Sequence, residues 1–174
     1  MNIQISVYVK KLYGEKYSSK QMIMDVFRMK DDSDIIYSEK GKPSLAKGDL
    51  FISASHADNY YVLGVAKTDI GIDIEPATRL VPDSVVERVF NDEEKEFIRF
   101  NPAQNGIFMW TRLEAALKLT GEGLSGIDGR TFMLYDEDEK IPDPVWYNTL
   151  RYGNMIISAA AYEPIEMNII NVED

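Results

Sequence analysis

The N-terminal part of the chain alternates apolar and polar residues in two different periods. From residue 3 to residue 9 every second residue is Ile or Val, and this period of two predicts a half-buried strand. Ser18 and Ser19 suit a helix N-terminus, and Met22 and Val26 follow one helical turn apart. The pattern therefore predicts a strand followed by an amphipathic helix.

The middle of the chain is rich in strand-forming residues. Residues 50–55 and 60–66 are apolar runs on either side of a polar turn, and residues 70–75 read Ile-Gly-Ile-Asp-Ile-Glu. Successive side chains of a strand point to opposite faces, so we expect the three isoleucines on one face and Asp73 and Glu75 on the other. The third strand thus has one apolar and one acidic face.

Helical signals dominate the next part. Asn91, followed by acidic residues, suits a helix N-terminus, and residues 107–119 are good helix formers that end before Gly121. Strand patterns return at 130–135 and 155–162, and the acidic C-terminal end is expected to fray.

Strands mixed with a few helices are typical of an α+β fold. We expect residues 1–174 to form one unit made of two halves, approximately residues 1–67 and 68–174.

Composition excludes several classes of function. The chain carries 19 basic and 29 acidic residues, a formal net charge of −10, and non-specific nucleic-acid binding needs a basic surface. There is no cysteine, and no stretch reaches the roughly 20 apolar residues that a bilayer span requires. We therefore expect a cytoplasmic protein with no nucleic-acid or membrane partner.

Asp73 and Glu75 are the first candidate for chemistry. Two carboxylates on one face of a strand can converge on one hard cation such as Mg²⁺, which takes one or two protein carboxylates together with waters and phosphates. The alternative is a solvated strand face, and the two residues alone favour that alternative.

Glu114 and Lys118 are the second candidate. They lie four residues apart and so share one face of the predicted helix, while Leu113 and Leu117 face the core. A third carboxylate suits a divalent ion, and a nearby ammonium suits a phosphate. The alternative is an ordinary ion pair on the surface of a helix.

The third candidate is the pair Ser55 and His56, which contains the only histidine of the chain. A Gly-x-Ser-x-Gly elbow is missing, so a hydrolase triad is disfavoured, whereas a turn that offers a hydroxyl and an imidazole suits a phosphate monoester. Lys42 lies in a Gly-Lys-Pro turn that could aim its ammonium at an anion; the alternative is an exposed turn lysine.

Four sequence blocks occur in a fixed order: Gly41-Lys-Pro, Phe51-Ile-Ser-Ala-Ser-His, Ile70-Gly-Ile-Asp-Ile-Glu, and Trp110-Thr-Arg-Leu-Glu-Ala-Ala-Leu-Lys with Thr120-Gly-Glu-Gly-Leu. Together they resemble the 4'-phosphopantetheinyl transferase superfamily, in its monomeric type that activates carrier proteins of peptide and polyketide synthases. The resemblance implies two similar α/β subdomains with antiparallel-type sheets and packed helices, related by a pseudo-twofold axis.

The resemblance also implies a reaction. The serine of an acyl- or peptidyl-carrier protein attacks the β-phosphate of coenzyme A, and 3',5'-ADP leaves. Asp73, Glu75 and Glu114 match the carboxylates that hold Mg²⁺, Glu114 also matches the general base, and Lys118 matches a lysine that contacts the phosphates.

Further positions match residues that hold coenzyme A. Ser55 and His56 match positions near its 3'-phosphate, and Lys20 stands where the family often has an arginine for the same phosphate. Lys42 and Pro43 belong to the Gly-Lys-Pro block that lines the coenzyme.

One departure from the family pattern keeps alternatives open. The residue before the helical glutamate is usually lysine, and here it is Leu113. This change is compatible with a catalytically weakened, coenzyme A-binding regulatory protein. A metal-dependent phosphohydrolase with the same carboxylates is a second alternative. Arg79, Arg88 and Arg99 are candidates for a patch that docks an acidic carrier, or are ordinary surface charges.

Overall fold

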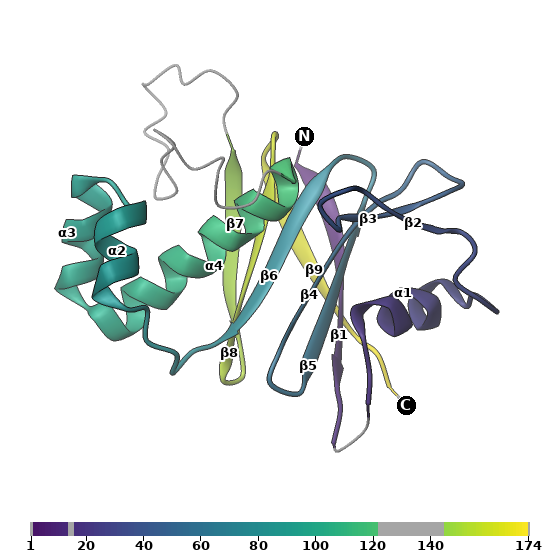
Figure 1. The fold of residues 1–174 in the computed structure, drawn as a ribbon, viewed down its shortest axis with the longest axis horizontal. Coiled ribbons are helices and arrows are strands. Elements are labelled where there is room, and N and C mark those ends of the chain that lie inside the picture. Colours follow the sequence, from purple (N-terminus) through teal and green to yellow (C-terminus); the bar gives the residue numbers. More distant parts are fainter. Residues whose placement is uncertain (1, 14–15, 122–144, 174) are drawn as a thin grey trace.

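The structure is a computed structural model, and it describes residues 2–13, 16–121 and 145–173. Two sheets pack face to face, with one helix outside the first sheet and a group of helices outside the second (Figure 1). The predicted α+β class is confirmed.

The first sheet has the order β4-β5-β1-β9. Its strands are β4 (Phe51–Ala57), β5 (Tyr60–Ala66), β1 (Ile3–Lys11) and β9 (Ile165–Asn171), so the three predicted strands in this part of the chain are confirmed. β9 pairs with β1 in parallel, whereas the other pairs are antiparallel. No strand was predicted at β9, whose backbone completes the edge of this sheet and ends at Asn171, before the acidic C-terminal residues.

The second sheet has the order β6-β8-β7 and is antiparallel throughout. It consists of β6 (Ile70–Pro76), β8 (Met155–Ala161) and β7 (Trp146–Tyr152), and β2 (Ile35–Tyr37) and β3 (Pro43–Leu45) form a separate hairpin. The strands predicted at 70–75 and 155–162 are thus confirmed, while the strand predicted at 130–135 lies outside the described residues.

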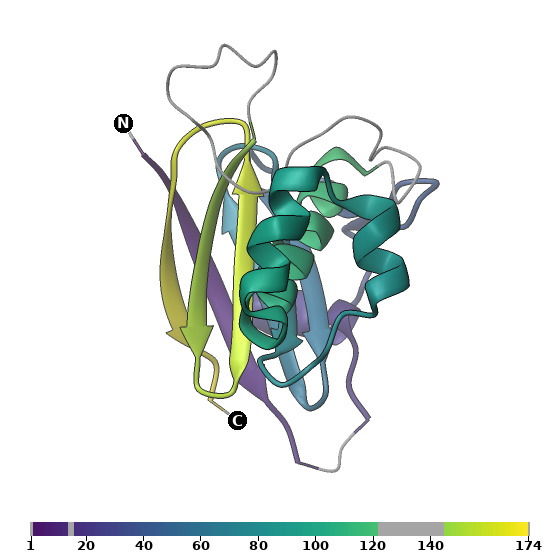
Figure 2. The ribbon, with the colours of Figure 1, turned by 90° about the vertical axis from the view of Figure 1, so that its left-hand side faces the viewer.

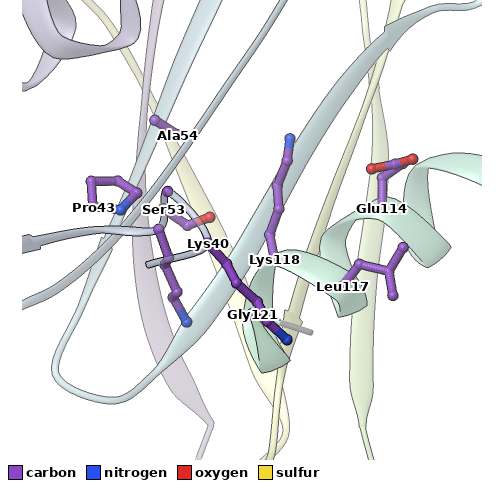
Figure 3. Close-up of a pocket in the computed structure, with 10 residues that line it drawn as sticks. Lys40, Pro43, Ser53, Ala54, Glu114, Leu117, Lys118 and Gly121 are labelled. Carbon is purple, nitrogen blue, oxygen red and sulfur yellow. The ribbon is translucent and has the colours of Figure 1, made fainter. Parts of the chain in front are cut away.

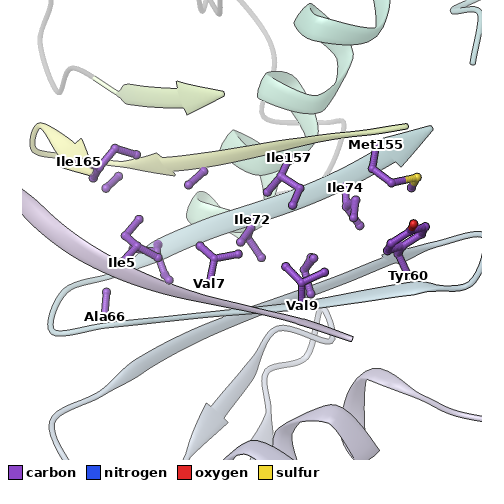
Figure 4. Close-up of a cluster of buried hydrophobic side chains, with 14 residues drawn as sticks. Ile5, Val7, Val9, Tyr60, Ala66, Ile72, Ile74, Met155, Ile157 and Ile165 are labelled. Carbon is purple, nitrogen blue, oxygen red and sulfur yellow. The ribbon is translucent and has the colours of Figure 1, made fainter. Parts of the chain in front are cut away.

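The main apolar core fills the space between the two sheets. Ile5 and Val7 of β1 face Ile72 and Ile74 of β6 and Ile157 of β8, and all five are almost completely buried (Figure 4). Neighbouring residues on β1 and β5 point the other way, toward α1. The alternation of the sequence therefore builds two apolar layers from one sheet.

The helices begin and end where the sequence supplies caps. Ser18 accepts a hydrogen bond at the start of α1 (Ser19–Phe27), and Asn91 forms a capping box at the start of α3 (Asp92–Phe100). α2 (Asp83–Val89) precedes it and packs with α3 against α4 (Figure 2).

Helix α4 (Pro102–Thr120) is longer than the predicted 107–119 because it starts earlier. Asn101 caps it and Pro102 occupies its first turn, where a missing N–H costs no helical hydrogen bond. Gly121 ends it in the left-handed conformation, as its position in the sequence predicted.

Gly71 allows α4 to lie directly on β6. A Cβ at this position would lie 1.8 Å from the carbonyl oxygen of Ala115 and 2.5 Å from the backbone nitrogen of Leu119. No side chain larger than hydrogen fits between strand and helix. The close contact brings the polar face of β6 beneath α4, and this contact positions the candidate site.

The predicted division near residue 67 falls in the link between β5 and β6, which belong to different sheets. The C-terminal β9 nevertheless returns to the first sheet, so the C-terminal part contributes strands to both sheets. Within the described residues, no helix combines the length and apolar character that crossing a membrane requires.

Candidate functional site

The acidic face of β6 is covered, not solvated. Asp73 is 4% exposed and Glu75 is 8% exposed. The predicted alternation of faces is correct, but the interpretation as a solvent-facing strand was wrong, because α4 and β4 cover this side of β6. Two carboxylates held in such a place need positive partners.

Asp73 meets two of its partners at one oxygen. Its Oδ1 accepts hydrogen bonds from the Ser55 hydroxyl at 2.8 Å and from the Lys118 ammonium at 2.7 Å, and the same ammonium lies 2.7 Å from Ser55 Oγ. The second oxygen, Oδ2, is buried and has no hydrogen-bond partner. Lys118 thus bridges from α4 to β4 and β6, and the proposed ordinary ion pair with Glu114 is not its arrangement.

Glu75 is held by two other residues. Its Oε1 accepts a hydrogen bond from the guanidinium of Arg79, with which it forms an ion pair, and one from the indole Nε1 of Trp110 at 3.4 Å. Trp110 lies one turn before Glu114 on α4. The helix therefore presents Trp110, Glu114 and Lys118 along one face toward the strand.

Glu114 completes the acidic group from the helix side. Burial raises the pKa of its carboxyl, and the negative charge of Asp73 raises it further, while the charge of Lys118 acts in the opposite direction. Burial likewise raises the pKa of Asp73, against the influence of Lys118 and Ser55. Both carboxylates therefore hold protons more tightly than exposed carboxylates do.

All of these side chains line one cavity of about 490 Å³. Its lining brings together residues of α1, β4, β6, the segment after β6, and α4: Ser19, Ala54, Ser55, His56, Asp73, Glu75, Arg79, Trp110, Glu114 and Lys118. The single cavity thus collects every predicted metal carboxylate and Lys118.

A second cavity of about 460 Å³ continues from the first. The two share Ala54, Glu114 and Lys118, and the second extends along the Gly-Lys-Pro turn, where Lys40, Lys42 and Pro43 line it. Figure 3 shows Glu114 and Lys118 leaving α4 on the same side, across from Pro43, Ser53 and Ala54. Together the two cavities form a groove with an acidic end and a lysine-rich end.

Of the predicted coenzyme-binding residues, Lys42 lines the second cavity and His56 lines the first. Lys42 is not an exposed turn lysine: its ammonium bonds Asp69 at 2.6 Å and the Leu119 carbonyl at 2.7 Å. His56 is exposed and stacks on Tyr61 with ring centroids 5.3 Å apart.

Ser55 and Lys20, expected near the 3'-phosphate of coenzyme A, do not both point into the open groove. The Ser55 hydroxyl is turned inward toward Asp73, and its residue is only 7% exposed. Lys20 is exposed on α1, where its ammonium pairs with Asp32 at 2.6 Å, and the cavity lining includes its neighbour Ser19 but not Lys20. The structure therefore brings Asp73, Glu75, Glu114, Lys118 and Ser55 together and leaves Lys20 apart.

The three carboxylates share a cavity but are not gathered around one point. Among the described residues, no group of three or more His, Cys, Asp or Glu side chains is arranged so that it could hold a metal ion. Lys118 and Arg79 instead neutralise Asp73 and Glu75. In this arrangement, cationic side chains supply the positive charge of the site.

Leu113 lies on the other side of α4. It is completely buried and packs with Val86, Phe90 and Ile98 of the α2–α3 segment. The expectation that it faces the core is confirmed. Leucine at this position therefore fills an apolar interface between helices and not a place in the cavity.

Three further residues line the cavities but were not predicted to do so from the sequence: Trp110, Lys40 and Arg79. Trp110 and Lys118 are eight residues apart and flank Glu114 by four on either side, so helical spacing was a signal for Trp110. Lys40 adjoins the Gly-Lys-Pro turn. Arg79 lies in the segment after β6, outside any helix or strand, so periodicity could not predict its orientation. A turn directs its side chain back to Glu75.

Comparisons with known proteins identify the family. The model of the 4'-phosphopantetheinyl transferase superfamily matches residues 69–156, just over half of the 174 residues. The chain is 28% identical over 134 residues to 4'-phosphopantetheinyl transferase psf-1 of Bacillus pumilus, which covers 71% of this chain and 57% of that protein.

It is also 36% identical over 104 residues to 4'-phosphopantetheinyl transferase HetI of Nostoc sp., which covers 53% of this chain and 43% of that protein. The chain thus spans about half the length of these relatives. The matched family region contains β6 and α4, the two elements that carry the carboxylates and Lys118. From the match over residues 69–156, the chain belongs to the 4'-phosphopantetheinyl transferase superfamily.

Proposed function

We propose that this protein transfers the 4'-phosphopantetheine group of coenzyme A to a serine of an acyl- or peptidyl-carrier protein, with Mg²⁺, and releases 3',5'-ADP. One observation carries the proposal: Asp73 and Glu75 of β6 and Glu114 and Lys118 of α4 line a single cavity. A cavity that combines carboxylates with an ammonium suits a metal ion and a diphosphate together.

The donor chemistry of the cavity fits a hard divalent ion. Its lining includes three carboxylates, and Oδ2 of Asp73 is a buried oxygen without a partner. We assign Asp73, Glu75 and Glu114 as the residues that would hold Mg²⁺. The ion, when bound, would neutralise the diphosphate and polarise the phosphorus that is attacked.

The side chains of the cavity then have distinct tasks. As the carrier serine Oγ bonds to the β-phosphorus, the bond from that phosphorus to the 3',5'-ADP oxygen breaks. Glu114, whose carboxylate lines the cavity beside Lys118, accepts the serine proton. Lys118, already within hydrogen-bond distance of Asp73 and Ser55, offers its ammonium to the phosphates.

The lysine-rich end of the groove suits the rest of coenzyme A. Lys40 and Lys42 stand beside Pro43 in a turn that ends at β3, and anionic groups bind readily near such ammonium groups. We propose that Lys42, Pro43, Ser55 and His56 contact the coenzyme. Lys20 would join them only by leaving Asp32, so its assignment to the 3'-phosphate is the least supported.

The alternative of a catalytically weakened protein gains little support from Leu113. A lysine there would have to replace a side chain that is completely buried against α2 and α3. The metal-dependent phosphohydrolase uses the same carboxylates, and the assay below separates it from the transferase.

The test is the mass of the carrier. The protein is incubated with coenzyme A, Mg²⁺ and a panel of apo-carrier proteins, and each carrier is weighed by mass spectrometry. We expect one carrier to gain a single phosphopantetheine, and Glu114→Gln to slow the gain by about 100-fold or more, as loss of a general base does.

The exposed Glu163 provides the matched control, since Glu163→Gln removes the same charge outside the cavity and should leave the rate unchanged. Hydrolysis of coenzyme A with no gain in the mass of any carrier would establish the phosphohydrolase instead. A rate that Glu114→Gln leaves unaltered would show that the base is another residue.

A further inference from the structure

Arg79 folds back onto the strand from which its segment departs. A turn closes where its backbone N–H donates to the Pro76 carbonyl at 3.0 Å, and its guanidinium then pairs with Glu75. The side chain of Arg79 is 51% exposed and that of Glu75 only 10%. The guanidinium is therefore a half-exposed cation placed on an almost buried carboxylate.

The same guanidinium is subject to the charge of all three carboxylates of the cavity. Arg79 bonds Glu75 directly and lines the same cavity as Asp73 and Glu114. These are the residues assigned above to Mg²⁺. The guanidinium of Arg79 thus occupies part of the space among the carboxylates that the proposed ion would take.

Binding of a divalent ion beside Arg79 and Lys118 has an electrostatic cost. Three carboxylates with Arg79 and Lys118 carry a formal charge of −1, and a divalent ion alone would turn it to +1 in a partly buried site. A metal ligand also needs its oxygen lone pairs, and Oε1 of Glu75 already accepts from Arg79 and Trp110. Arg79 is the cation that can leave, because its side chain is half exposed.

We propose that Arg79 is an internal counterion of the ion site, bound to Glu75 until a divalent ion displaces its guanidinium into the open groove. This inference rests on the proposed function. It accounts for one observation: among the described residues, the carboxylates share a cavity without forming a ready ion site. Arg79 therefore opposes binding of the ion to the protein when coenzyme A is absent.

The test is the affinity of the protein for Mn²⁺, measured by the electron paramagnetic resonance signal of free Mn²⁺ without any coenzyme or carrier. Arg79→Gln should bind Mn²⁺ roughly 3- to 10-fold more tightly than the unaltered protein. This factor corresponds to the free energy of a partly exposed ion pair. Arg79→Lys should stay near the unaltered protein because it keeps the charge.

Two controls separate competition at Glu75 from a change in overall charge. Arg28→Gln removes one positive charge from an exposed residue at the end of α1 and should not change the affinity. In a Glu75→Gln background, Arg79→Gln should no longer tighten binding, since its partner is gone. Melting curves show whether each variant is folded, and the half-exposed Arg79 side chain leaves the core intact.

The outcomes distinguish this inference from the proposed function. If the unaltered protein binds Mn²⁺ and Arg79→Gln binds it equally or more weakly, the counterion role is wrong and the function stands. A gain that persists with Glu75→Gln also overturns it. If neither protein binds Mn²⁺ even with coenzyme A present, the ion site and the counterion role both fall.

Discussion

Both faces of β6 are covered, yet they have opposite chemistry. On one face Ile70, Ile72 and Ile74 are at most 1% exposed in the core between the sheets (Figure 4). On the other face Asp73 and Glu75 are at most 8% exposed beneath α4. Burial of an isoleucine stabilises the fold directly, whereas burial of a carboxylate is favourable only with partners.

The difference shows how one strand serves both stability and function. The apolar face supplies the free energy that holds the two sheets together. The polar face is held in place by that packing and by Gly71, which lets the helix lie on the strand. The carboxylates are consequently held at low exposure by energy that comes from the opposite side of the same strand.

The largest effect is expected where helix and strand touch. In Gly71→Val the new side chain collides with the backbone of Ala115 and Leu119, so α4 cannot keep its place. We expect a loss of more than about 3 kcal/mol in the free energy of unfolding, measured by urea denaturation.

Gly106 is the matched control on α4. A Cβ there would lie 3.8 Å from Ile98 and Val81, an ordinary contact, so Gly106→Ala should be neutral or slightly stabilising. Equal stability of Gly71→Val and the unaltered protein would mean that α4 is not seated on β6 as described.

A charge placed on the far side of α4 comes next. Leu113→Lys introduces the residue that the resemblance implies at this position, and it puts an ammonium into the buried contact with Phe90 and Ile98. We expect a loss of about 3 kcal/mol by denaturation, with Leu113→Met costing less than about 1.5 kcal/mol. A large rise in the transfer rate without loss of stability would instead favour the weakened-enzyme alternative.

On the apolar face, Ile72→Ala should lower the free energy of unfolding by about 3 kcal/mol, because it leaves a cavity between the sheets. Affinity for coenzyme A, measured by calorimetry on the folded variant, should change little. Ile72→Val should cost about 1 kcal/mol. If Ile72→Ala loses affinity for coenzyme A without losing stability, the apolar face of β6 contributes to the site, and the division of roles between the two faces is wrong.

On the polar face the effect depends on pH. Burial raises the pKa of Asp73, so below the ordinary range of an aspartate both folded and unfolded states are protonated. As the pH rises, the unfolded state loses its proton first, and the folded state loses stability until Asp73 also ionises.

Asp73→Asn has no such titration. Its free energy of unfolding should therefore improve relative to the unaltered protein between mildly acidic and neutral pH, measured by urea denaturation without divalent ions. Asp49→Asn, at an exposed residue, gives the background. A difference that shrinks as the pH rises would show that Lys118 and Ser55 outweigh burial.

Much of the architecture could be predicted from periodicity. Alternation identified β1 and β6, apolar runs identified β4 and β5, a strand pattern identified β8, and the cap at Asn91 and the glycine at 121 marked helix ends. β9 was not predicted, although Ile165, Met167 and Ile169 alternate with polar residues, and its parallel partner β1 lies at the other end of the chain. A local pattern does not show with which distant strand a segment pairs.

The candidate site was predictable in its residues but not in its pairing. Spacing gave the faces of Asp73, Glu75, Glu114 and Lys118, and ordered motifs gave the family. Local spacing favoured an ion pair between Glu114 and Lys118, whereas the packing of α4 on Gly71 places Lys118 on Asp73. Contacts across elements decide which charges meet.

The most direct test is a crystal structure with coenzyme A and Mn²⁺, with the ion located by its anomalous scattering. We predict one ion within about 2.5 Å of carboxylate oxygens of Asp73, Glu75 and Glu114, a normal range for oxygen ligands, beside the diphosphate of the coenzyme. An ion bound elsewhere, or a diphosphate that lies away from the groove between β6 and α4, would contradict the account.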